Sequence, residues 1–272
     1  MSESPLFDPN HPIWQPMSFR QLEAVRVDMG PLSMIISRRD EEWRFRYRIA
    51  PEAMRDALHV SRASLDDTLD IGDTIERVAA HDVEESREIQ LMPLLADRFV
   101  SARPETPVTI APGSYAAMYV TTPLWLRVVR LPDRSTLLEL PSFRPVDTWL
   151  GPATGEGPLG YASRVNGRLN INQLRLSPMR AISKVTLKNS GNAPLLLPRV
   201  VIPTPELRLF IDEQGRHWSN EVVITRGRDG QLSEVTYLAR TPEEAGKTTI
   251  IAEPRANQGN VFARAMSSIL GV

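Results

Sequence analysis

Short runs of alternating apolar and polar residues, separated by turn residues, fill the start of the chain. Residues 22–29, 33–37 and 43–49 alternate in this way, with Gly30-Pro31 and Arg39-Asp40-Glu41 between them. A period of two is typical of half-buried strands, so these runs predict an opening meander. In residues 43–49 the alternation is strict, which places the aromatic side chains on one face and the arginines on the other.

The same pattern of short β-branched or aromatic runs between turn residues continues along the chain. Further strands are predicted in the first half at residues 89–92, 108–110, 116–120, 124–131 and 136–140. In the second half they are predicted at residues 169–176, 182–188, 195–202, 207–211, 221–225, 233–238 and 248–251. Strands at this spacing, without long helices between them, favour a sandwich or barrel. We predict an all-β fold of two sandwich-like antiparallel units, residues 1–145 and residues 146–272.

Two segments depart from the strand pattern and predict helices. Residues 51–58 begin like a helix, although Asp and Ser residues weaken the pattern before Leu69, so we expect one short internal helix. Apolar residues recur at helical spacing in residues 261–270 and predict a C-terminal helix. We expect this helix to pack on its own domain, with packing on a partner as the alternative.

One uncharged stretch, residues 107–126, is as long as a membrane-spanning helix. Pro112-Gly113-Ser114 and Thr121-Thr122-Pro123 interrupt it, so we expect a buried hairpin of two short strands instead. Residues 1–8 contain no basic region followed by an apolar run, which a signal for export would need. A cytoplasmic location is therefore expected.

Charge and composition narrow the classes of partner. The 272 residues include 32 Lys and Arg against 33 Asp and Glu, so a net charge of −1 gives no overall field to attract nucleic acid. Lysine occurs only at Lys184, Lys188 and Lys247. The excess of arginine could serve carboxylate or phosphate recognition, or it could reflect the coding bias of a GC-rich genome. The arginines of residues 43–49 fit a solvated strand face better than a nucleic-acid or acidic-partner surface.

Several kinds of catalytic site lack the residues they need. Cysteine is absent, which removes disulfides, thiolate metal sites and cysteine nucleophiles. The four histidines have no zinc-ligand spacing, and no Gly-x-Ser-x-Gly occurs. The acidic residues after His81 could suggest a divalent ion, but calcium loops need a ligand order and a turn glycine that are missing there. We therefore expect no metal and no cofactor.

Glycines, prolines and aromatic residues crowd together in residues 147–164, the segment that most resembles a site. The candidate binding residues are Trp149, Gly151, Gly155, Glu156, Gly157, Tyr161 and Arg164. Trp149 and Tyr161 would supply contact area, while Glu156 and Arg164 would supply polarity. On this interpretation the chain is a non-enzymatic binding or interaction protein whose partner is a protein or a small molecule.

Residues 147–164 could also form a nucleotide-binding loop, a catalytic carboxylate pair or a purely architectural element. A nucleotide loop is disfavoured because the phosphate-binding lysine is missing and prolines remove backbone donors. Asp147 and Glu156 could form a carboxylate pair of a hydrolase acting on a sugar-like substrate. The segment could instead be architectural, with Asp147 capping a turn, Trp149 filling the interface between the units, and glycines at positive φ.

A second small cluster follows the turn at Gln214-Gly215-Arg216. Trp218 stands where a strand resumes, beside His217. We expect the Trp in the core and the His in solvent, in preference to a ligand site.

The chain resembles an uncharacterised prokaryotic family, the domain of unknown function 432. The resemblance rests on residues 89–129 with Pro107-Val108-Thr109-Ile110-Ala111-Pro112-Gly113 and Thr122-Pro123-Leu124-Trp125, on Asp147-Thr148-Trp149-Leu150-Gly151 with Gly155-Glu156-Gly157 and Tyr161-Ala162, and on residues 180–203. The family pattern has an aromatic residue where this chain has Leu150 and a cysteine near Gly160, so a thiol role is ruled out here.

The resemblance implies a type of fold more than an activity, because no activity is established for the family. It also implies a membrane-channel partner, since such proteins are encoded beside small mechanosensitive channels. Neither the resemblance nor the residue pattern predicts an oligomeric state.

Overall fold

The computed structural model describes residues 11–50, 58–69, 73–79, 87–151, 157–227 and 232–257, together with Phe262 and Met266. The described chain is all-β, with several antiparallel sheets and no helix of seven or more residues. Its helical elements are 3-10 turns of three residues, namely η1 (Pro12–Trp14), η2 (Ile171–Gln173), η3 (Thr204–Glu206) and η4 (Glu243–Ala245). Short alternating runs thus give strands, as the sequence predicts.

The strands group into two compact units that are not contiguous in sequence. We call Phe7–Leu94 with Pro123–Arg144 the N-terminal unit, and Leu95–Thr122 with Pro145–Val272 the C-terminal unit. The sequence predicts a single division after residue 145. The compact units differ from that division because residues 95–122 contribute strands to sheets that the later half of the chain forms.

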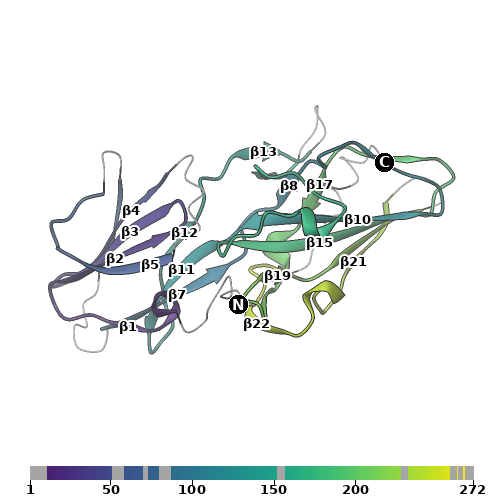
Figure 1. Ribbon diagram of the computed structural model, residues 1–272. Helices are drawn as coiled ribbons and strands as arrows, with labels where there is room; N and C mark the ends of the chain where they lie inside the picture. The colour runs from purple at the N-terminus through teal and green to yellow at the C-terminus, as the bar shows by residue number, and fades with distance from the viewer. Residues whose placement is uncertain are drawn as a thin grey trace. The chain divides into compact units, whose positions relative to one another are not determined.

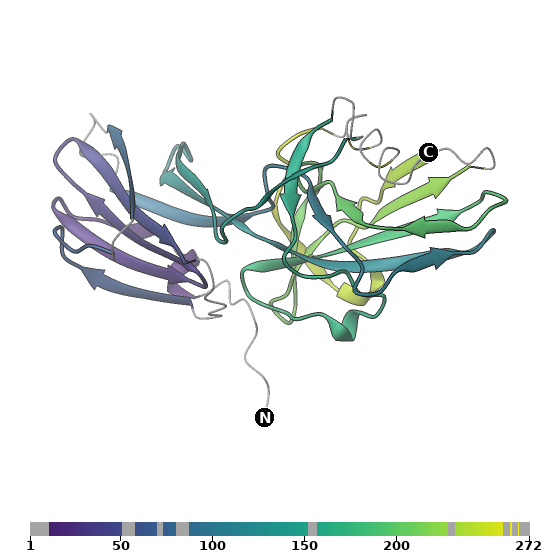
Figure 2. The same cartoon turned by 90° about the horizontal axis from the view of Figure 1, so that it is seen from above.

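The N-terminal unit contains two antiparallel sheets (Figure 1). One has the order β5 (Leu58–Ala63), β2 (Glu23–Met29), β3 (Leu32–Arg38), β4 (Glu42–Ile49), β6 (Thr74–Ala79). The other has the order β1 (Met17–Ser18), β7 (Glu88–Leu94), β11 (Trp125–Leu131), β12 (Thr136–Pro141). The succession β2, β3, β4 confirms the predicted opening meander, whose strands appear in purple in Figure 2.

The core of the N-terminal unit follows from the strict alternation in β4. Trp43 and Phe45 are fully buried on one face, and Phe19, which follows β1, packs edge-on against Trp43 with ring centroids 5.1 Å apart. Residues of the second sheet such as Ile89 and Leu126 are also fully buried. Aromatic pairs of this geometry add to the free energy gained from burial.

The arginines of β4 lie on the opposite face and are engaged by carboxylates. Arg44 forms an ion pair of 2.6 Å with Glu42, and Arg46 forms one of 3.4 Å with Asp73. This pairing supports the interpretation of a solvated strand face, since the charges are matched within the sheet.

The C-terminal unit contains a larger mixed sheet and two smaller sheets. The large sheet has the order β21 (Leu232–Tyr237), β20 (Val222–Arg226), β15 (Arg180–Asn189), β19 (His217–Ser219), β18 (Leu209–Asp212), β22 (Thr248–Ala252), and β10 (Tyr115–Pro123) also pairs with β15. A four-stranded sheet has the order β13 (Asp147–Trp149), β14 (Leu159–Ala162), β8 (Val100–Ala102), β17 (Val200–Ile202). β16 (Leu195–Leu197) pairs with β9 (Val108–Ile110).

The C-terminal unit also contains parallel pairs, since β15 runs parallel to β19 and β20, and β14 runs parallel to β8. The prediction that both units are antiparallel is therefore wrong for these strand pairs.

The core of the large sheet is built around Trp218, which is fully buried with Ile182, Phe210 and Ala245. This confirms the predicted core position of the tryptophan. The predicted exposure of His217 is wrong, because its side chain is only 1% exposed. All three residues of β19 are buried, so both faces of this strand are covered.

Neither predicted helix is seen. Residues 51–57 lie outside the described part of the chain, and Leu58–Ala63 forms the strand β5, because its alternating residues pair with β2 along the sheet edge. Of residues 261–270 only Phe262 and Met266 are described, and both are fully buried. The strand predicted at residues 169–176 is also wrong, since that segment contains η2.

The uncharged stretch at residues 107–126 contains the two predicted strands but not the predicted hairpin. β9 pairs with β16, whereas β10 pairs with β15. The turn at Pro112-Gly113 marks where the chain reverses without determining which strands become neighbours. Among the described residues we find no helix with the length and apolar character needed to cross a membrane.

Candidate functional site

The segment that most resembles a site in the sequence forms a β-hairpin within the C-terminal unit. Asp147 lies opposite Tyr161, and Trp149 lies opposite Leu159, in the antiparallel pair of β13 and β14. The backbone N–H of Leu150 donates to the carbonyl of Pro158 at 3.1 Å and extends the ladder toward the loop. We call β13 and β14, with the adjoining Leu150, Gly151, Gly157 and Pro158, the Trp149 hairpin.

Two glycines close the neck of the Trp149 hairpin. A Cβ atom added at Gly157 would lie 2.3 Å from the Cα of Gly151, and one added at Gly151 would lie 2.7 Å from the Cα of Gly157. The indole of Trp149 covers both positions. Its Cζ2 atom would lie 2.8 Å from the Cβ added at Gly151 and 3.2 Å from the Cβ added at Gly157. Neither glycine has a positive φ. The predicted reason for these two glycines was therefore wrong: the hairpin needs them for close approach of its strands.

Replacement of Gly157 by alanine should force the neck of the Trp149 hairpin open. The new methyl group would overlap backbone and the indole, and overpacking of this kind costs roughly 1 to 3 kcal/mol. We expect a red shift of Trp149 fluorescence, isolated by difference against Trp149→Phe, and faster amide exchange in β14. Leu196→Ala is the control, because it shortens a side chain of the same unit that is 57% exposed on β16. Unchanged Trp149 emission in Gly157→Ala would contradict the tight neck.

Trp149 and Leu159 form an exposed apolar pair on the outer face of the hairpin. Their side chains share one face because the residues are directly opposite, and they are 40% and 53% exposed. The architectural interpretation expected a buried Trp149, which the structure does not show. The sequence reasoning missed Leu159, whose signal was its position after Gly157-Pro158 on the strand facing Trp149.

Charged and polar groups flank this apolar pair. Arg98 forms an ion pair of 3.4 Å with Asp147, and its guanidinium lies 5.4 Å from the ring centroid of Tyr161. Tyr161 is buried and donates a hydrogen bond of 2.9 Å to Asp97. Burial and this hydrogen bond raise the pKa of Tyr161 above its usual value, so it stays protonated at neutral pH. Tyr161 lies two residues from Leu159 on β14, so it shares the face of Trp149 and Leu159 and is the buried neighbour of that exposed pair.

The remaining predicted site residues are placed as follows. Gly155 and Glu156 lie outside the described residues, so the carboxylate pair of Asp147 and Glu156 stays a prediction. The side chain of Asp147 is 66% exposed and engaged by Arg98. Arg164 is exposed in the turn that follows β14. Arg98 was not among the predicted residues, because it precedes β8 and only the sheet brings it to the hairpin.

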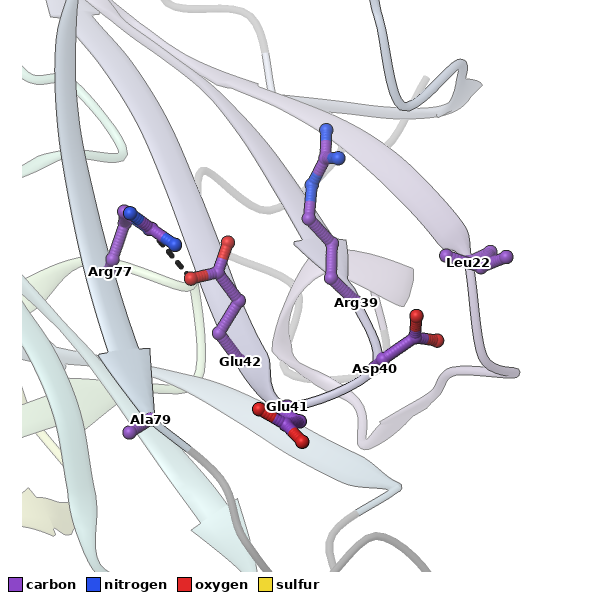
Figure 3. A pocket seen from close by; sticks show the side chains of 7 residues that line it. All are labelled: Leu22, Arg39, Asp40, Glu41, Glu42, Arg77 and Ala79. Atoms are coloured by element: carbon purple, nitrogen blue, oxygen red, sulfur yellow. Dashed lines mark hydrogen bonds and ion pairs between the residues drawn. The ribbon is translucent and has the colours of Figure 1, made fainter.

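A second candidate is an open depression of about 710 Å³ in the N-terminal unit (Figure 3). It is lined by Leu22, Arg39, Asp40, Glu41, Glu42, Arg77 and Ala79. Its charges are largely matched within the protein, since Glu42 binds Arg77 at 2.6 Å and Asp40 accepts a hydrogen bond from Gln21 at 2.6 Å. Leu22 adopts an unusual positive φ of 59° and is half exposed there. Nothing in this lining supplies a nucleophile with a neighbouring base.

Within the described ranges, no three His, Asp or Glu side chains gather as ligands of a metal ion would. The acidic loop beginning at His81 lies outside those ranges up to residue 86. At the Trp149 hairpin the described side chains offer apolar surface in Trp149 and Leu159 and opposite charges in Arg98 and Asp147.

Comparison with known proteins gives one match. The family model described as "Protein of unknown function (DUF432)" matches residues 13–269, which is nearly the whole chain. No curated protein and no solved structure matches the chain.

Proposed function

The chain belongs to the DUF432 family of proteins of unknown function, and from that premise we propose that it is a non-enzymatic binding protein that engages a protein partner through the Trp149 hairpin. The exposed pair of Trp149 and Leu159 on the paired strands β13 and β14 carries this proposal. A cytoplasmic location and a protein in preference to a small molecule as partner are parts of the same proposal.

The composition of the hairpin face supports a docking role. Protein interfaces are enriched in Trp, Tyr and Arg, and a few such residues supply most of the binding free energy. Here a tryptophan and a leucine are flanked by the ion pair of Arg98 and Asp147. An apolar centre with a charged rim is the usual organisation of such a surface.

The packing around Trp149 is a second support. The indole lies against Gly151 and Gly157, and Arg199 donates a hydrogen bond of 3.0 Å to the carbonyl of Trp149. A contact group that is already ordered loses little conformational freedom on binding, so more of its contact free energy remains as affinity.

Replacement of Trp149 by alanine should abolish capture of the partner from cell lysate. Truncation of a central aromatic residue in an interface commonly costs about 2 kcal/mol or more, which is roughly a 30-fold loss of affinity. The full-length protein is immobilised, the captured partner is identified, and its affinity is then measured with purified components. Cooperative melting of the variant shows that the fold is intact.

Tyr115→Ala is the matched control for this experiment. Tyr115 is an aromatic residue of the same unit that is 72% exposed on β10, so its loss removes exposed aromatic area away from the hairpin. The proposal requires that Tyr115→Ala retain the partner while Trp149→Ala loses it. If both variants bind equally well, the hairpin is not the docking surface.

A further inference from the structure

Two arginines face each other at one end of the sheet β13-β14-β8-β17. In the antiparallel pair of β17 and β8, Val200 lies opposite Ala102 and Val201 lies opposite Ser101. Continuing this register by one residue sets Arg199 opposite Arg103. Like charges at directly opposed positions of neighbouring strands destabilise a sheet, so this pairing has a cost that calls for a compensating role.

The charges of these two arginines are not neutralised within the described part of the chain. The guanidinium of Arg199 donates to the carbonyl of Trp149 at 3.0 Å, which is a neutral partner. Arg103 is exposed, and the nearest acidic residue on its own segment, Glu105, is engaged by Arg168. Neither Arg103 nor Arg199 forms an ion pair with a described residue.

The pKa of Arg199 also reflects the positive charge of Arg103. Partial burial lowers the pKa of Arg199, and the positive charge of Arg103 lowers it further. The opposed positions of the two residues on neighbouring strands account for this effect of one charge on the other. An anion between them would remove the repulsion and gain charge-assisted hydrogen bonds from both.

We propose that Arg103 and Arg199 form a binding site for a phosphate group at this end of the sheet. Two guanidinium groups carry two positive charges, which a phosphate of about −1.5 to −2 neutralises at neutral pH, whereas a single carboxylate leaves excess charge. Planar guanidinium forks also match the spacing of phosphate oxygens. The site adjoins the Trp149 hairpin, because Arg199 also donates to the carbonyl of Trp149, but it uses neither exposed apolar side chain of that hairpin and does not depend on the function proposed for them.

Phosphate should stabilise the full-length protein in a saturable way through this site. A ligand that binds only the folded state raises the melting temperature as its concentration exceeds the dissociation constant. Thermal melts are recorded with increasing phosphate and, at matched ionic strength, with sulfate, acetate and chloride. We expect phosphate and sulfate to raise the melting temperature by several degrees and acetate and chloride to have little effect. An equal effect of acetate or chloride would overturn the proposal.

Arg103→Gln is the deciding variant, because Arg103 is exposed and its side chain forms no hydrogen bond or ion pair with a described residue. It should weaken phosphate binding at least about tenfold. In low salt without phosphate, the variant should melt at or above the temperature of the unchanged protein, because the repulsion is gone. Arg127→Gln, which breaks an ion pair of 2.9 Å with Glu139 in the N-terminal unit, should leave phosphate binding unchanged. Retained phosphate binding in Arg103→Gln would refute the site.

The source of the phosphate group is resolved by a further comparison. Glycerol 3-phosphate and inorganic phosphate are titrated under the same conditions. Tighter binding of the ester assigns a phosphate group carried by a larger molecule, and equal binding assigns free phosphate. Either result supports the site, whereas binding of neither contradicts it.

Discussion

Replacement of Trp218 by alanine is expected to destabilise the C-terminal unit by about 3 to 5 kcal/mol, the range for removal of a buried aromatic side chain. The side chain is fully buried with Ile182 and Phe210. Its indole N–H also donates to Asp212 at 2.8 Å, so truncation leaves a buried carboxylate with one donor fewer. Urea unfolding followed by circular dichroism should show an earlier transition.

Two control variants separate burial from the hydrogen bond. Trp218→Phe keeps most of the apolar area and loses only the donor to Asp212, so we expect a smaller loss than for alanine. Tyr115→Ala removes an exposed aromatic residue of the same unit and should change the free energy of unfolding by less than about 0.5 kcal/mol. Equal effects of Trp218→Ala and Tyr115→Ala would mean that Trp218 is not a core residue.

Acidification should remove about 3 kcal/mol of stability through His217 between pH 6.5 and pH 4.5, at roughly 1.4 kcal/mol per pH unit. Burial lowers the pKa of His217 to about 3, although the nearby charge of Asp212 acts to raise it. The folded state therefore keeps this side chain neutral while the unfolded chain takes up a proton below its usual pKa. Stability from this residue is complete above pH 6.5 and is lost as the pH falls toward 3.

The contribution of His217 is isolated by comparison with His217→Gln. Free energies of unfolding are measured by urea titration at pH 7 and pH 4.5 for both proteins. All other titrating groups are shared, so the unchanged protein should lose about 3 kcal/mol more than the variant. Leu196→Ala, a change of a non-titrating exposed residue in the same unit, should follow the unchanged protein. Equal losses in His217→Gln and the unchanged protein would contradict a neutral buried histidine.

The sequence predicts burial correctly where the alternation of residues within one strand decides it. The prediction fails where elements from elsewhere in the chain decide which side chains are buried. In β4 the alternation alone separates Trp43 and Phe45 from the arginines, because the strand has one buried face. His217 defeated the same reasoning, since β19 lies inside a sheet and both of its faces are covered. Likewise, nothing within residues 107–126 indicates that β9 pairs with β16 rather than with β10.

The candidate site was predictable as a segment but not as a surface. The crowding of glycines around Trp149 marks residues 147–164 in the sequence. The register of β13 and β14 brings Gly151 close to Gly157 and places Leu159 opposite Trp149. Arg98 reaches the hairpin from about fifty positions away in the sequence. The facing pair of Arg103 and Arg199 had no local signal at all, because the pairing of β8 with β17 creates it.

The interleaved division of the chain has a consequence for its synthesis. Within the part of the chain that the structure describes, the backbone passes from one unit to the other at residues 94–95, 122–123 and 144–145. As the polypeptide leaves the ribosome, β8 and β10 emerge long before β17 and β15, the strands with which they pair. Strand edges that wait for partners are prone to association with other chains. A nascent chain of this protein therefore carries unpaired strands through much of its translation, and a gene cut at any one of these crossings encodes fragments that each lack part of a sheet.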